Sequence, residues 1–158
     1  MIRKLAIYEK EPLTTVEATE ATLHETLCFA SADSPTTTQS ATATRPARCL
    51  LIFGPDSTTP AGMALYYYSY STWRSRAGIY LEDLFVVETA RGRGYGKALL
   101  KALANEVQTM GGARLEWSVL KWNEPSIKFY EAMGAQPQHE WLGMRVDGDA
   151  LVSLANRQ

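Results

Sequence analysis

A glycine-rich loop carries the residue types for anion binding. The segment Arg91-Gly92-Arg93-Gly94-Tyr95-Gly96-Lys97 follows an apolar, strand-like run and opens a helix-like one. Glycines let bare backbone N–H groups approach an anion at the positive end of a helix. The segment therefore predicts a phosphate-binding loop, in which Arg91 and Arg93 add charge-assisted bonds. The structural alternative is a glycine-rich helix start with a surface arginine and no ligand.

Two common phosphate motifs do not fit this loop. A Walker loop requires Ser or Thr directly after its Gly-Lys pair, where this chain has Ala98. The dinucleotide fingerprint requires a third glycine where Lys97 stands. The anion is therefore expected to belong to another kind of ligand.

Polar residues with acid or base chemistry lie on both sides of the loop. Glu82 and Asp83 interrupt the apolar run Ile79 to Val87, and Tyr130 ends the segment Trp122-Asn123-Glu124-Pro125-Ser126-Ile127-Lys128-Phe129-Tyr130. If the run is a regular strand, neighbouring side chains point to opposite faces, so the two carboxylates have separate roles. The alternatives are a solvated or ion-paired strand carboxylate and a tyrosine packed in the core.

These segments together resemble the GNAT N-acetyltransferase superfamily. Arg91-x-x-Gly94-x-Gly96 looks like its acyl-CoA pyrophosphate loop, and the segment ending at Tyr130 looks like its N-x-x-A/S-x-x-F-Y motif. With the runs Tyr80 to Val86 and Gly62 to Tyr68, the chain is similar to the diamine (spermidine/spermine) N-acetyltransferase group. The resemblance covers residues 60 to 148.

The resemblance implies direct acetyl transfer from acetyl-CoA to an amine. Backbone amides of the loop would hold the pyrophosphate, and main-chain groups before it would pair with the pantetheine arm. Tyr130 would protonate the leaving thiolate, and Asn123 would orient the cofactor arm. The implied cofactor-binding residues are Phe85, Val86, Val87, Arg91, Gly92, Arg93, Gly94, Tyr95, Gly96, Lys97, Asn123 and Tyr130.

On the amine side, the resemblance implies that Glu82 accepts the proton of the substrate. Asp83 would be a second contact or a structural carboxylate, and Trp73 would contact the amine. Aromatic residues could line this site by cation–π contact, or could form an ordinary apolar strand face. Alternation along a strand places them on one face: Tyr66, Tyr68, Tyr70, Trp73 and Tyr80.

The chain departs from the resembled group at two places. Ser71 stands where the group has an acid before Trp73, and Arg74 and Arg76 follow, which weakens attraction for a long polycation. A smaller amine, a lysine analogue or a protein amine is then favoured. By the resemblance, we also expect the first strand of the family to be missing, and a partner would cover the exposed edge. Homodimers are usual in the group and are expected here.

Positioning these residues requires an α/β fold. We expect the GNAT acyl-CoA N-acyltransferase fold, a mixed central sheet with a splayed parallel pair and flanking helices, in a single domain over residues 1–158 with a low-complexity loop at 31–47. Expected helices are Leu5 to Glu11, Thr15 to Phe29, Gly94 to Met110, Glu124 to Gly134 and Asp149 to Leu154. Expected strands are Arg48 to Phe53, Gly62 to Tyr70, Ile79 to Val87, Leu115 to Leu120 and Trp141 to Asp147.

The composition narrows the classes of partner that the protein can be expected to bind. A net charge of −1 on 158 residues gives no basic field for nucleic acid or an anionic membrane surface. The two cysteines, and the lack of a long apolar run, indicate a reduced cytoplasmic protein. No Cys/His cluster has metal-ligand spacing, so no metal is expected.

The leading interpretation is an acetyl-CoA-dependent N-acetyltransferase for a primary amine of a small molecule, such as a diamine, polyamine or lysine analogue. A non-catalytic acyl-CoA-binding regulatory module on the same fold is one alternative. Acetylation of peptide or protein lysines is another.

Overall fold

A four-stranded sheet organises the first of two compact units in the computed structural model, which describes residues 1–29, 40–55 and 58–157. The units are Met1–Trp122 and Asn123–Gln158, and each is described by itself. The sheet order is β1-β2-β3-β4, with antiparallel pairing except between β3 and β4, which are parallel. The strands are β1 (Ala47–Phe53), β2 (Pro60–Ser71), β3 (Arg76–Val86) and β4 (Leu115–Trp117).

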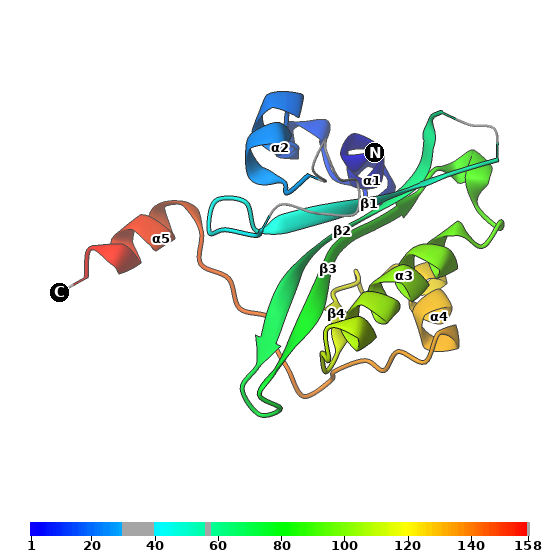
Figure 1. Ribbon diagram of the computed structural model, residues 1–158. Helices are drawn as coiled ribbons and strands as arrows, with labels where there is room; N and C mark the ends of the chain where they lie inside the picture. The colour runs from blue at the N-terminus through cyan, green and yellow to red at the C-terminus, as the bar shows by residue number, and fades with distance from the viewer. Residues whose placement is uncertain (30–39, 56–57, 158) are drawn as a thin grey trace. The chain divides into compact units, whose positions relative to one another are not determined.

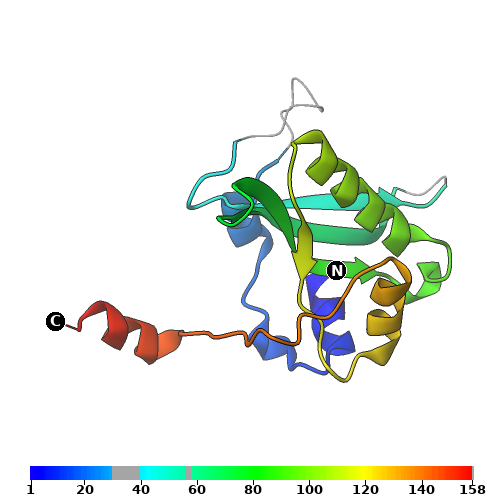
Figure 2. The same ribbon diagram turned by 90° about the horizontal axis from the view of Figure 1, so that it is seen from below.

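Helices flank this sheet, which confirms the expected α/β class with its parallel pair. The first unit contains α1 (Ile2–Tyr8), α2 (Glu20–Thr26) and α3 (Tyr95–Thr109), with short 3-10 turns at Leu13–Thr15 and Glu88–Ala90. The second unit contains α4 (Glu124–Ala132) and α5 (Gly148–Ala155). Figure 1 shows α1 and α3 on opposite sides of the sheet, and Figure 2 shows β4 beside β3.

The apolar stripe of α3 forms the core on one face of the sheet. Its buried residues are those that the helical spacing predicted, namely Leu99, Leu100, Leu103 and Val107. Leu103 is fully buried, as are Ile79 and Leu81 of β3. This packing places the N-terminus of α3, and with it the glycine-rich loop, beside the end of β3.

The opposite face is covered at one end by α1. Leu5 packs with Met63 and Phe85 in a second apolar cluster, against which Tyr8 and Cys49 also pack. Beyond this cluster, toward the β2–β3 turn, the same face carries half-buried polar and aromatic side chains. One face of the sheet therefore packs in the core under α3, and the other carries polar and aromatic side chains beyond α1.

Four predicted elements differ from the structure. The helix expected at Leu5 to Glu11 runs instead from Ile2 to Tyr8, and the chain has left the helical conformation by Lys10, whose φ is 65°. The helix expected at Thr15 to Phe29 is limited to α2, because a capping box between Thr19 and Thr22 starts it and Leu27 leaves it to bridge to Ala47. The strand expected at Leu115 to Leu120 ends at Trp117, where its pairing with β3 stops.

The strand expected at Trp141 to Asp147 is absent, since no other strand lies in the described part of the second unit to form a ladder with it. Of the expected loop at 31–47, residues 31–39 lie outside the described residues, and Ala47 belongs to β1.

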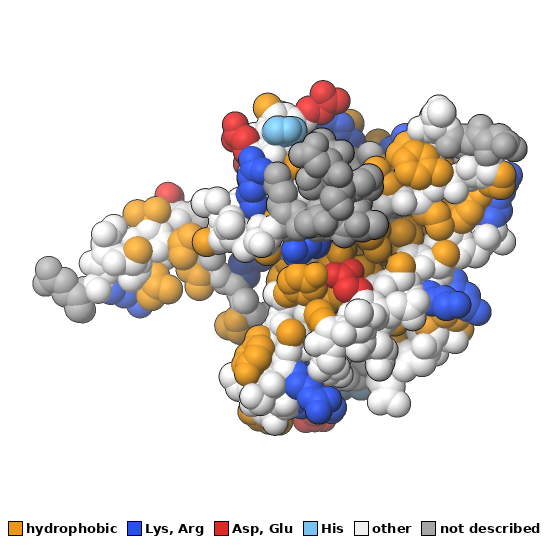
Figure 3. Space-filling model, viewed as in Figure 1, with side chains coloured by type: hydrophobic (Ala, Val, Ile, Leu, Met, Phe, Trp, Pro, Cys, Tyr) orange, Lys and Arg blue, Asp and Glu red, His pale blue; other side chains and the backbone are white. Residues whose placement is uncertain are grey.

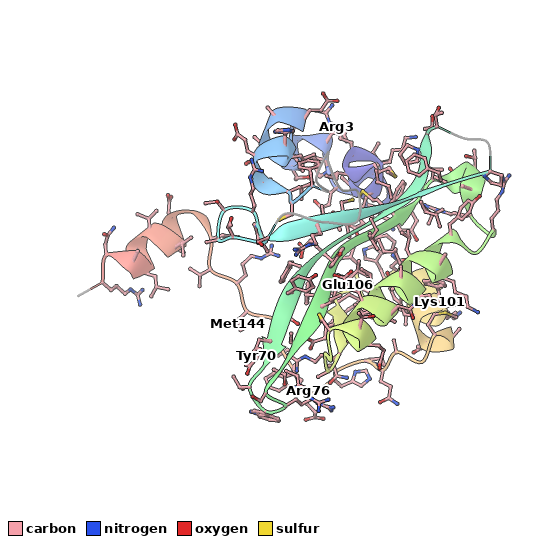
Figure 4. The ribbon with its side chains drawn as sticks, in the orientation of Figure 1. Arg3, Tyr70, Arg76, Lys101, Glu106 and Met144 are labelled. Atoms are coloured by element: carbon pink, nitrogen blue, oxygen red, sulfur yellow. The ribbon has the colours of Figure 1, made fainter. Side chains whose placement is uncertain are left out.

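A half-buried carboxylate, that of Glu106, ties α3 to β2. Glu106 accepts hydrogen bonds from Tyr66 Oη at 2.8 Å and from Tyr68 Oη at 2.5 Å. The Arg48 guanidinium of β1 lies 4.6 Å from the Tyr68 ring centre. In Figure 4 Glu106 points from α3 toward the strands, and Figure 3 shows an acidic group there among apolar side chains. Burial and the bond to Glu106 raise the pKa of Tyr68 to about 12.

We expect Glu106→Ala to lower the free energy of unfolding by about 2–4 kcal/mol, because it removes two hydrogen bonds and leaves the Tyr66 hydroxyl without its acceptor. Urea unfolding followed by circular dichroism measures this loss. Gln108→Ala, at an exposed position of the same helix, should change stability by less than about 0.5 kcal/mol. Equal losses in both variants would contradict a specific role for the carboxylate.

Candidate active site

The glycine-rich loop has the backbone geometry of an anion site. Gly92 and Gly94 adopt positive φ angles of 75° and 81°, and Gly94 is the N-cap of α3. No side chain caps this helix, so the N–H groups of its first turn are available to a ligand. No heavy atom outside the neighbouring residues lies within 4 Å of where a Cβ would stand at either glycine. A ligand can therefore reach this backbone closely.

The charged residues of the loop behave differently from one another. Arg93 and Lys97 are exposed beside the helix start. Arg91 instead donates from Nε to the carbonyl of Val86 at 3.1 Å, and its guanidinium lies 4.8 Å from the centre of the Tyr8 ring. In this conformation Arg91 serves the packing of α1 on β3, and binding phosphate would require it to turn.

The parallel pair splays beside the loop. β3 pairs with β4 only from Ile79 to Leu81 and then continues alone to Val86 on that side. Of the main-chain groups predicted to meet a ligand, the N–H of Val87 is already bonded to Ala61 O at 2.9 Å. Strand alternation then directs the groups of Val86 toward the open side.

Glu82 occupies a β-bulge in β3. Leu65 pairs with Asp83 and Tyr66 pairs with Leu81, so Glu82 has no partner residue on β2. The strand is thus not regular here, and the expectation that the two carboxylates must point to opposite faces loses its premise. Glu82 is exposed, and among the described residues no ion pair involves it.

Asp83 is a half-buried carboxylate among other acids. Burial, with added repulsion from Glu82 and Glu9, raises the pKa of Asp83 to about 6. Burial and the nearby Asp83 in turn raise the pKa of the Cys49 thiol to about 11. Cys49 is therefore a neutral packing residue at neutral pH rather than a nucleophile.

The predicted aromatic cluster does not share one face. Tyr66 and Tyr68 turn toward α3 and bind Glu106. Tyr80 instead stacks on Tyr67, with ring centres 5.2 Å apart and planes 26° apart. The bulge explains why the prediction was wrong. It shifts the pairing of β2 with β3 by one residue, so that Tyr80 pairs with Tyr67 rather than with Tyr68. Trp73 and Tyr70 lie at the far end of the β2–β3 hairpin, where Trp73 is 91% exposed.

Tyr67 and Glu116 were missed as site residues by sequence reasoning. The register aligns Tyr67 with Tyr80, and Tyr80 with Glu116, in one row across three strands. Burial first, and then the charges of Glu82 and Glu116, raise the pKa of Tyr67. Alternation along β2 and β4 would have placed Tyr67 and Glu116 on the face of Tyr80 only if the bulge in β3 had been known, because the bulge decides which residues pair.

The second unit carries the remaining predicted residues. Asn123 is the N-cap of α4, and its Oδ1 accepts from Ser126 N at 3.4 Å. Pro125 lies in the first turn, as the sequence predicted. Tyr130 follows Phe129 with ring centres 5.4 Å apart. The roles of Asn123 and Tyr130 in binding and proton transfer stay predictions.

Within residues 1–29, 40–55 and 58–157, no group of three or more His, Cys, Asp or Glu side chains is arranged to hold a metal ion. None of the helices there has both the length and the apolar character needed to cross a membrane.

The fold and the loop geometry are those expected for the GNAT family. The Acetyltransferase (GNAT) family profile matches residues 16–135, which is most of the chain. The chain belongs to this family.

Two of the curated relatives are acetyltransferases with small amines in their names. The chain is 43% identical over 94 residues to an L-ornithine N5-acetyltransferase of Arabidopsis thaliana, covering 60% of this chain and 41% of the relative. It is 39% identical over 106 residues to a thialysine N-epsilon-acetyltransferase of Bos taurus, covering 65% and 62%. The chain thus spans between two fifths and two thirds of these relatives.

Solved structures agree on the fold. An integron cassette protein from the mobile metagenome of V. cholerae matches with a TM-score of 0.65 and 30% identity, covering 71% of this chain and 68% of the other. The tetramutant of a Bacillus halodurans protein matches with a TM-score of 0.59 and 18% identity over 92% of this chain and 87% of its own, which shows the fold alone.

We expect Asp83→Asn to become increasingly stabilising, relative to the wild type, as the pH rises. The folded pKa of about 6 exceeds the ordinary value of 3.8, so the folded state holds the proton more tightly and loses stability as the pH climbs through this window. Partial solvation limits the difference between pH 4 and pH 7 to roughly 1–2 kcal/mol. Denaturant unfolding across that range measures it. Asp149→Asn, at an exposed position, is the control, and a pH-independent difference for Asp83→Asn would refute the assignment.

Proposed function

We propose that this protein is an acetyl-CoA-dependent N-acetyltransferase for a primary amine of a small molecule. The observation that carries the proposal is the open, left-handed glycine loop at the start of α3, which directly follows the strand bearing Glu82. Family membership supports it, because GNAT acetyltransferases use acetyl-CoA as cosubstrate. The proposal treats residues 1–158 as one catalytic domain.

The residues of this chain fit that cosubstrate. The uncapped first turn of α3 supplies backbone N–H donors for a pyrophosphate, and exposed Arg93 and Lys97 add positive charge. The outward groups of Val86 offer one strand-like pairing for an extended arm once Arg91 releases the carbonyl. Acetyl-CoA supplies an activated thioester whose carbonyl carbon the amine attacks.

Proton transfer completes the reaction. Glu82, exposed at the bulge, attracts the ammonium group of the acceptor and takes its proton, directly or through water. The amine nitrogen then forms the new C–N bond while the C–S bond breaks. Tyr130 donates its phenolic proton to the departing sulfur. The nitrogen loses its second proton as the amide forms, and that proton returns through water to the tyrosinate, so the products are an amide and a thiol, with the proton on Glu82 released to solvent. No covalent acyl-enzyme is needed.

The acceptor proposed here is small. The relatives named above act on ornithine or thialysine, and a human spermidine/spermine N(1)-acetyltransferase-like protein is 30% identical over 104 residues, although these cover only 15% of its length. Ser71 and two exposed arginines, Arg74 and Arg76, weaken the attraction for a long polycation.

A homodimer, as in the resembled group, is also proposed. The edge strand β1 supports it, because Leu51 and Phe53 are 48% and 45% exposed there, a surface that a second copy can cover.

We expect Tyr130→Phe to lower kcat about 10²- to 10⁴-fold while acetyl-CoA affinity stays within about threefold, because only the proton donor is removed. Thiol release with ornithine, lysine, thialysine, putrescine, spermidine and a lysine peptide measures turnover. Glu82→Gln should lower kcat/KM by a similar factor. Glu131→Gln, which removes an exposed carboxylate next to Tyr130, is the matched control and should act like the wild type.

Saturable acetyl-CoA binding with no turnover on any acceptor would favour the binding-module alternative. Turnover on the peptide alone would favour protein acetylation.

We expect Gly94→Ala to weaken acetyl-CoA binding at least about tenfold, because an L-residue at a φ of 81° strains the loop whose N–H groups face the pyrophosphate. Isothermal titration calorimetry measures the affinity. Gly111→Ala is the control, since Gly111 has a φ of 64° just past the other end of α3 and also has open space around it. It should lose similar stability and keep its affinity, and equal weakening in both variants would contradict the assigned loop.

A further inference from the structure

The sheet face on which α1 packs carries, toward the β2–β3 turn, a stacked pair of tyrosines in line with a carboxylate. Tyr67, Tyr80 and Glu116 are direct partners across β2, β3 and β4, so their side chains project to the same side. The two rings stack 5.2 Å apart, and the Tyr80 and Ser118 hydroxyls are hydrogen-bonded at 2.8 Å. Both rings are half-buried, which fixes their planes while leaving part of each ring accessible.

The two ends of this aromatic surface have different charge. At the bulge end stands Glu82, with Asp83 beyond it, and no described cation forms an ion pair with either. At the other end Arg114 Nε lies 2.6 Å from Glu116 Oε2. The side chains of Arg114 and Glu116 are 40% and 38% exposed, so both can also contact a ligand.

Gly78 makes the Arg114 end possible. A Cβ at Gly78 would lie 2.9 Å from the Arg114 carbonyl oxygen and 3.2 Å from Arg114 Cγ. The absence of a side chain at Gly78 therefore lets Arg114 lie against the sheet, two residues along the strands from the row of tyrosines. The close contact with Gly78 therefore helps to fix the position of Arg114 beside Glu116.

The Arg114–Glu116 pair matches one chemical group better than others. The pair is neutral overall, and it keeps free N–H donors on the guanidinium and a second carboxylate oxygen. An α-amino acid head, with its ammonium and carboxylate, complements both members. The terminal ammonium of a diamine would be attracted by the Glu116 carboxylate and repelled by the Arg114 guanidinium. Charge complementarity therefore favours a zwitterion at this end.

The spacing also suits such a ligand. Glu82 and the Tyr80–Glu116 row are two residues apart along β3, which corresponds to roughly 7 Å of strand rise. The side chain of ornithine or lysine is of comparable length. Its methylenes would lie on the tyrosine rings, whose faces also attract the distal ammonium group.

We propose that Arg114 and Glu116 form a subsite for the α-carboxylate and α-ammonium of a basic amino-acid acceptor, whose chain lies on Tyr67 and Tyr80 and whose distal amine reaches Glu82. This inference rests on the proposed acetyltransferase function and names the class of acceptor. It makes ornithine or lysine, rather than the diamine that lacks the carboxylate, the preferred type of substrate.

The test compares ornithine with putrescine, which differ by the carboxylate alone, through kcat/KM for each. We expect the wild type to prefer ornithine. Arg114→Gln should lower kcat/KM for ornithine about 10- to 100-fold, mainly through KM, and leave putrescine within about twofold. Arg114→Lys should recover part of the loss. Arg3→Gln, at an exposed arginine of α1, should leave both values unchanged.

A second variant tests the ammonium half and guards against a folding defect at Arg114. Glu116→Gln should lower kcat/KM for ornithine but not for δ-aminovalerate, which keeps the carboxylate and lacks the α-amine. An unchanged ornithine-to-putrescine ratio in Arg114→Gln, or a wild type that prefers putrescine, would overturn the subsite and leave the acetyltransferase function intact. Turnover of no amine at all would overturn both.

Discussion

The register between β2 and β3 is the constraint on which the site depends. Ten of the eleven residues of β3 pair with β2, and the remaining one, Glu82, is an extra residue without a partner. This single insertion turns the side chains after it to the other face relative to simple alternation. Ile79 and Leu81 can therefore bury under α3, while Phe85 packs under α1 on the opposite side. Glu82 lies at the bulge, where the register shifts, and it is exposed and has no partner residue on β2.

Local patterns predicted what local forces decide. The glycine loop, the buried stripe of α3 and the proline at the start of α4 follow from nearest-neighbour spacing, and the structure contains all three. The faces of the tyrosines depend on pairing between strands, so alternation alone joined Tyr66 with Tyr80 and overlooked Tyr67. Arg91 shows a second limit, because no sequence pattern says that its guanidinium prefers a carbonyl and an aromatic ring.

Two acidic groups illustrate how the same residue type serves different ends. Glu106 is surrounded by hydroxyl donors and holds a helix on a strand, whereas Asp83 sits among other carboxylates and has a weakened tendency to ionise. The first stabilises the fold, and the second costs stability at neutral pH. A strand that keeps such a carboxylate beside an exposed one concentrates negative potential at its bulge, where a cationic acceptor would arrive.

Arg91 connects two parts of the first unit through one guanidinium. It bonds the last residue of β3 and lies on the ring of Tyr8, so the same group contributes to the docking of α1 and stands next to the loop proposed to bind an anion. A ligand that draws Arg91 toward itself must release these contacts and loosen the N-terminal helix. The order of residues 2–8 and the occupancy of the loop are thus thermodynamically linked, and each shifts the equilibrium of the other by the same free energy.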